Sequence, residues 1–164
     1  MDYRLWTFGY GQYSSKIRIE KLLASFRANG ISDLIDIRHS PCASQIDPKS
    51  NYGPRPWNLQ ASGGISNEVE AIGIRYRWVP QLGTPQKRDP EMRILRAELA
   101  APEAPWPINL GLAWLAETIK SASSDQRIGI LCACDSYDYC HRKLVAESLR
   151  DRHFGGELEI RCPR

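Results

Sequence analysis

Apolar residues recur along the chain with two periods, one typical of strands and one typical of helices. Short strand-like runs occupy residues 4–9, 33–37, 74–79, 127–133 and 155–162. Between them, apolar residues recur at intervals of three and four, which predicts helices. The predicted helices follow Ser14 or Ser15, run from Ser66 to Ile72, begin at Asp89–Pro90, and span residues 109–121 and 141–152.

The alternation of strands and helices predicts an α/β fold. We expect a single domain over residues 1–164, with a mainly parallel central sheet of about five strands and helices on both faces. The run at 127–133 is the most apolar and is therefore the predicted central strand. Residues 40–64 contain four prolines and no periodic pattern, which predicts a long irregular loop that serves as a lid or as a partner surface.

Composition and charge indicate a soluble protein of the cytoplasm. Apolar residues make up 42% and charged residues 25% of the 164-residue chain, and no run is long enough to span a membrane. In a reducing compartment, five cysteines are expected as thiols or metal ligands. The net charge is only +3, but residues 75–96 hold six basic residues against two acids. That basic segment would suit a phosphate-bearing partner, but a solvated face in which Glu91 pairs with Arg93 or Arg96 is the simpler interpretation.

The tryptophans divide into two groups. Trp6, Trp78, Trp106 and Trp114 lie in or beside strand and helix patterns, and we expect them in the core. Trp57 lies in the irregular loop, where it is free to cover a ligand or to stack on a base.

In a parallel α/β sheet, ligands bind at the carboxyl ends of the strands. Three segments fall at such ends: Tyr10 after the first strand, Asp36 and Arg38 at the second, and the segment from Cys132 to Arg142 after the central strand. We expect these segments to converge on one site, although they lie far apart in the sequence.

Four motifs resemble those of the DUF488 family over nearly the whole chain. They are TFGY near the start, LIDIRHSP, GIRYRWVPQLG and the final CHR, which is the most specific of the four. Tyr10 stands where many members have histidine, and residues 46–64 are longer and richer in proline than the family pattern. The resemblance implies an α/β domain but brings no assigned activity, so the function has to be argued from the chemistry of the residues.

The segment from Cys132 to His141 allows a metal site. Cys132, Cys134, Cys140 and His141 form a set of four sulfur and nitrogen ligands, as in structural zinc sites. The spacing C-x-C-x5-C-H is unusual, and adjacent cysteine and histidine at a helix start are expected to point in different directions. Zinc is therefore an alternative here and not the favoured interpretation.

The same segment also allows thiol chemistry. Cys140 precedes a predicted helix, where backbone amides, His141 and Arg142 would stabilise a thiolate. Cysteine-based phosphatases and rhodanese-type sulfurtransferases hold anions with a similar strand, loop and helix. Their glycine-rich loop and Cys-x5-Arg spacing are absent, so sulfur or phosphate transfer is the first alternative function.

Anion binding without a covalent step is the favoured hypothesis. Arg38, Arg142 and the amides at the helix start would hold a phosphate. Asp36, Cys140 and His141 are the candidate catalytic residues, and Tyr10, Trp57 and Tyr137 would stack on a base.

We therefore expect a nucleotide or nucleic-acid fragment as ligand, with hydrolysis or group transfer as the reaction. The remaining alternative is a non-enzymatic module, either binding nucleic acid through the basic segment or stabilised by zinc.

Overall fold

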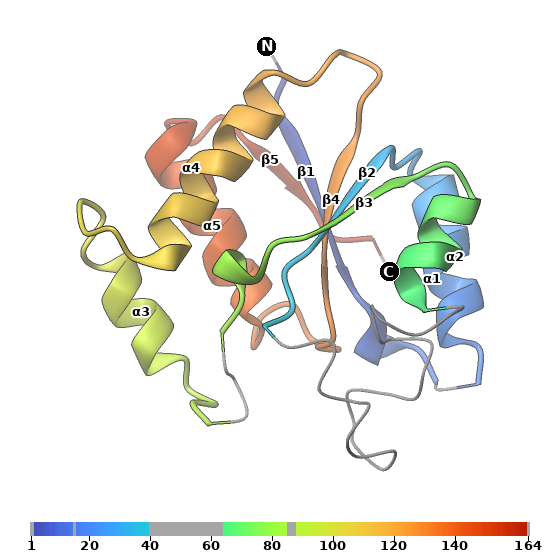
Figure 1. Ribbon diagram of the computed structural model, residues 1–164, viewed down its shortest axis with the longest axis horizontal. Helices are drawn as coiled ribbons and strands as arrows, with labels where there is room; N and C mark the ends of the chain where they lie inside the picture. The colour runs from blue at the N-terminus through green and yellow to red at the C-terminus, as the bar shows by residue number, and fades with distance from the viewer. Residues whose placement is uncertain (1, 15, 40–63, 85–87, 164) are drawn as a thin grey trace.

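The computed structural model describes residues 2–14, 16–39, 64–84 and 88–163. In these residues it contains five strands in one sheet, every pair parallel, and confirms the predicted α/β class (Figure 1). The strands are β1 (Arg4–Gly9), β2 (Asp33–Asp36), β3 (Arg75–Trp78), β4 (Ile128–Cys132) and β5 (Glu159–Arg161). The expected irregular loop, with Trp57, lies almost entirely outside the described residues.

The strand order is β3-β2-β4-β1-β5, so β4 is the central strand, as its apolar sequence predicted. All five of its residues are buried. Gly9 at the end of β1 pairs with Cys132, and Asp36 at the end of β2 pairs with Leu131. Because β2, β4 and β1 are neighbours with the same direction, their carboxyl ends meet at one edge, as expected from the sequence.

Helices cover both faces of the sheet, which was also predicted (Figure 1). They are α1 (Arg18–Ala28), α2 (Ile65–Ala71), α3 (Arg93–Leu99), α4 (Pro107–Lys120) and α5 (His141–His153), with short 3-10 turns η1 (Tyr10–Gln12) and η4 (Pro80–Leu82). One apolar core lies between the sheet and α1 with α2, and another lies between the sheet and α4 with α5. α3 packs beside α4 at the rim. None of the helices in the described part of the chain is long and apolar enough to cross a membrane.

The start of α3 differs from the prediction. Asp89 was expected to cap a helix beginning at Pro90, but Met92 adopts a left-handed conformation with φ of 55° and the regular helix begins at Arg93. Met92 is the N-cap residue, so the assignment of Asp89 to that position was wrong. Asp89 Oδ2 nevertheless accepts a hydrogen bond from the Ile94 amide in the first turn, at 2.7 Å.

Two of the four tryptophans expected in the core are not there. Trp6 is buried and Trp114 is partly buried against the core, as predicted. Trp78 is 40% exposed and Trp106 is 46% exposed, so their assignment to the core was wrong. Trp78 lies on the edge strand β3, where its Nε1 donates to the Arg38 carbonyl at 2.8 Å. Trp106 is the residue before α4 and lies outside its apolar face.

Candidate metal centre at the carboxyl edge of the sheet

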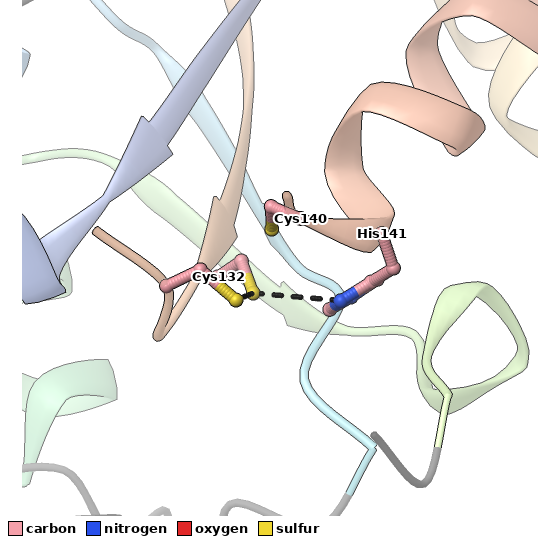
Figure 2. A group of neighbouring side chains, drawn as sticks. Cys132, Cys140 and His141 are labelled. Carbon is pink, nitrogen blue, oxygen red and sulfur yellow. Dashed lines mark hydrogen bonds between the residues drawn. The ribbon is translucent and has the colours of Figure 1, made fainter. Parts of the chain in front are cut away.

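Four donor side chains meet where β4 ends and α5 begins. The ligand atoms of Cys132, Cys134, Cys140 and His141 all lie within 4.8 Å of one another. Cys132 Sγ lies 3.5 Å from Cys134 Sγ and 3.6 Å from His141 Nδ1. Figure 2 shows the His141 ring at the start of the helix directed toward the Cys132 side chain at the strand end. These four residues could hold a metal ion.

Local backbone geometry explains why the four side chains converge. Cys132 ends β4 and Cys134 follows two residues later, so both can project to the same side of the chain. Cys140 is the residue before α5 and has extended φ and ψ angles of −115° and 144°. His141 is the first helical residue. The change from extended to helical backbone between them turns both side chains to one point, so the expectation that they would diverge was wrong.

The histidine ring is held in one orientation by the neighbouring strand. His141 Nε2 lies 3.1 Å from the carbonyl oxygen of Ile37, the residue after β2. A carbonyl oxygen only accepts, so this contact assigns the ring proton to Nε2 and leaves the Nδ1 lone pair directed at Cys132. Metal-binding histidines are typically held in this way by a carbonyl or carboxylate behind the ring.

The thiols influence one another strongly. Burial opposes ionisation of Cys132, but hydrogen bonds with Cys134 and Cys140 and the charge of Arg142 outweigh it and lower its pKa well below the ordinary value. Burial and the neighbouring thiols raise the pKa of Cys140. In the absence of a cation, ionisation of one thiol disfavours ionisation of its neighbours. A metal ion at the centre would stabilise all of the thiolates at once.

The predicted pair Asp36 and Arg38 forms a buried network beside this centre. Arg38 donates from Nε to both carboxylate oxygens of Asp36 at 2.9 Å, and its backbone amide donates to Oδ1 at 3.0 Å. Arg38 also donates from Nη1 to Tyr10 Oη at 3.3 Å. Burial raises the pKa of Tyr10 to about 12. The structure therefore brings these three predicted residues together, while their roles in binding and catalysis stay predictions.

Tyr76 is a member of this network that reasoning from the sequence did not include. Its hydroxyl donates to Asp36 Oδ2 from the adjacent strand β3. Burial, followed by the charge of Asp36, raises the pKa of the Tyr76 hydroxyl. The alternation of Ile74, Tyr76 and Trp78 placed Tyr76 on the half-buried face of a strand, but it did not reveal the carboxylate that the hydroxyl would meet.

Arg142 is almost completely enclosed, with 4% of its surface exposed. Its Nη2 lies 3.4 Å from the carbonyl oxygen of Asp135, and its guanidinium lies 5.8 Å from the centre of the Tyr137 ring. Nε and Nη1 have no hydrogen-bond partner among the described residues. Thus Tyr137, predicted to stack on a base, stacks here on Arg142, and its role toward a ligand stays a prediction.

No family model matches the chain, and no curated protein or solved structure matches it significantly. The resemblance to the DUF488 family therefore stays a prediction, and the function has to be argued from the site itself.

Proposed function

We propose that this domain binds one zinc ion through Cys132, Cys134, Cys140 and His141. The arrangement of the donor atoms is the observation that carries the proposal. Zinc bonds of ~2.3 Å to sulfur and ~2.05 Å to nitrogen, at tetrahedral angles, separate two sulfurs by ~3.8 Å and a sulfur from a nitrogen by ~3.6 Å. Cys132 Sγ lies 3.5 Å from Cys134 Sγ and 3.6 Å from His141 Nδ1, and all four donor atoms lie within 4.8 Å of one another, so an ion would draw the more distant donors inward.

The proposed role of the ion is structural. Four protein ligands complete a tetrahedral shell, whereas catalytic zinc sites keep one position for water or substrate. Three of the four ligand residues, Cys132, Cys140 and His141, are also buried. The ion would join the end of the central strand to the start of α5, and through His141 it would be linked to the end of β2.

Binding of a phosphate-bearing ligand at the same edge is the second candidate function. The observation favouring it is Arg142, whose Nε and Nη1 lack acceptors in the described part of the chain. It has less support than the metal site, because Arg38 is already paired with Asp36 and Arg142 is enclosed.

Elemental analysis of the purified protein tests the metal proposal. We expect about one zinc per chain, lost on substitution of Cys132→Ser or His141→Gln. Cys162→Ser is the matched control, because Cys162 is exposed and is not one of the four residues. Cobalt substitution provides a second readout, since thiolate-bound tetrahedral cobalt has characteristic visible absorption. A protein that folds without metal and takes up neither ion would refute the proposal.

A further inference from the structure

Arg142 carries a positive charge in a part of the molecule from which water is largely excluded. It is 4% exposed, and among the described residues it forms no ion pair with a carboxylate. An uncompensated charge is very unfavourable in such surroundings, so a negative group is expected close by. The other buried arginine of this edge, Arg38, satisfies the same requirement with Asp36.

The thiols of Cys132, Cys134 and Cys140 are a source of negative charge next to Arg142 in the fold. The backbone amide of Arg142 donates to Cys140 Sγ at 3.4 Å. Its guanidinium packs against Gly9, whose partner in the sheet is Cys132. The backbone of Arg142 therefore contacts one proposed ligand, and its side chain lies beside the strand residue that pairs with another.

We propose that Arg142 is the counter-ion of the metal–thiolate centre, an inference that rests on the proposed zinc site. Zinc contributes two positive charges, three thiolates contribute three negative charges, and a histidine whose Nε2 proton is donated to Ile37 is neutral. The loaded centre therefore has a net charge of −1. The guanidinium neutralises it, which explains how both can lie within the protein.

The end of β1 is shaped to admit this side chain. A Cβ built on Gly9 would lie 1.7 Å from Arg142 Nη1 and 2.2 Å from the Cys134 carbonyl oxygen. Any side chain at position 9 would thus occupy the space of the guanidinium. The buried position of the Arg142 guanidinium therefore depends on glycine at position 9 of β1, although Gly9 lies far from the proposed ligands in the sequence.

Zinc affinity of charge variants tests the assignment. Arg142→Met removes the charge but keeps much of the apolar stem, and Arg142→Lys keeps the charge. We expect the Arg142→Met variant to bind zinc about 10- to 100-fold more weakly in competition with a chelator, the range found for groups supporting metal ligands. We expect the lysine variant to recover most of the affinity. Arg150→Met, on the same helix but paired with exposed Asp151, is the control.

The pH profile separates a charge effect from a packing effect. Without the nearby cation the thiolates are harder to form, so half-saturation with zinc should shift to higher pH in the methionine variant and not in the lysine variant. Should the methionine variant fail to fold, judged by circular dichroism, Arg142→Gln gives the same comparison.

Equal zinc affinity in the wild-type protein and in the methionine or glutamine variant would overturn the counter-ion role. So would a lysine variant that is as weak as the uncharged variant. Absence of zinc from the wild-type protein would instead refute the metal site, so the two failures can be told apart.

Discussion

His141 Nε2 and the carbonyl oxygen of Ile37 lie 3.1 Å apart, although 104 residues separate them in the chain. The contact links the first turn of α5 to the end of β2, across the central strand. It fixes the ring that supplies the only nitrogen ligand of the candidate metal centre. Binding at this centre should therefore stabilise the contacts between strand ends as well as the loop that carries the cysteines.

Zinc should raise the stability of the whole domain. A ligand that binds only the folded state and is present at about 100 times its Kd adds about 2.7 kcal/mol to the free energy of unfolding. For a domain of this size, that corresponds to an increase in Tm of about 5–10 °C. Thermal unfolding with zinc and with a chelator, followed by circular dichroism, measures the difference. Identical Tm values in a protein shown to carry zinc would contradict the proposed structural role.

Asp36→Asn should be strongly destabilising. Asp36 and Arg38 are both completely or almost completely buried, and the substitution leaves the guanidinium without its counter-charge. Breaking such a pair by removing one partner costs about 3–5 kcal/mol. Urea unfolding gives the free energy, and Asp33→Asn is a matched control. Asp33 pairs with Arg75, whose side chain is 58% exposed, so its loss should cost less than about 1 kcal/mol. Similar costs for the two variants would argue against a special role for the buried pair.

Gly9→Ala should disturb Arg142 and weaken metal binding together. The added methyl group would overlap Nη1 of Arg142 and the Cys134 carbonyl oxygen, and a rigid strand end cannot move away easily. We expect a loss of about 1–3 kcal/mol in the free energy of unfolding. The control for metal binding is Gly111→Ala in α4, where the added methyl group would also be tight, 2.9 Å from Leu82 Cδ2, but would not meet Arg142 or the cysteines. It should change stability without changing zinc affinity. A Gly9→Ala variant with normal stability and zinc affinity would show that position 9 tolerates a side chain.

His153 should make a small contribution to the loss of stability in acid. Burial lowers its pKa, and the charges of Lys120 and Arg152 lower it further. As the pH falls below about 6.5, the unfolded chain takes up the proton first, so the folded state loses stability. His153→Gln removes this term. Between pH 7 and pH 5, the free energy of unfolding should fall less in the variant than in the wild type. Because the ring is only partly buried, the difference between the two losses should be no more than about 0.5 kcal/mol. Urea titrations at the two pH values measure it, and a larger loss in the variant would contradict the assigned sign.

The sheet was predictable because its strands have distinct apolar patterns. The fully apolar run around Ile130 identified the central strand, and alternation between strands and helices predicted parallel pairing. The edge position of β3 was not predictable. The alternation of Tyr76 and Trp78 with polar residues is typical of a half-buried strand, both at the edge of a sheet and between two other strands. That position explains why Trp78 is exposed.

The candidate site was only partly predictable. The four potential metal ligands were identified, but their convergence depends on the backbone angles at Cys140, which spacing alone does not determine. Arg38 is bonded to Asp36, because its side chain turns back toward its own strand, and its expected role in holding a ligand stays a prediction. Such pairings depend on side-chain direction, and the order of residues carries little information about it.

The strand order has a consequence for how the chain folds during synthesis. β1 and β2 are made first, but they are not neighbours: β4 lies between them. A nascent chain that ends before Ile128 can pair β2 with β3, while β1 has no partner strand within the described residues. The ribosome must therefore deliver the central strand, and the cysteines and histidine that follow it, before the two halves of the sheet can join.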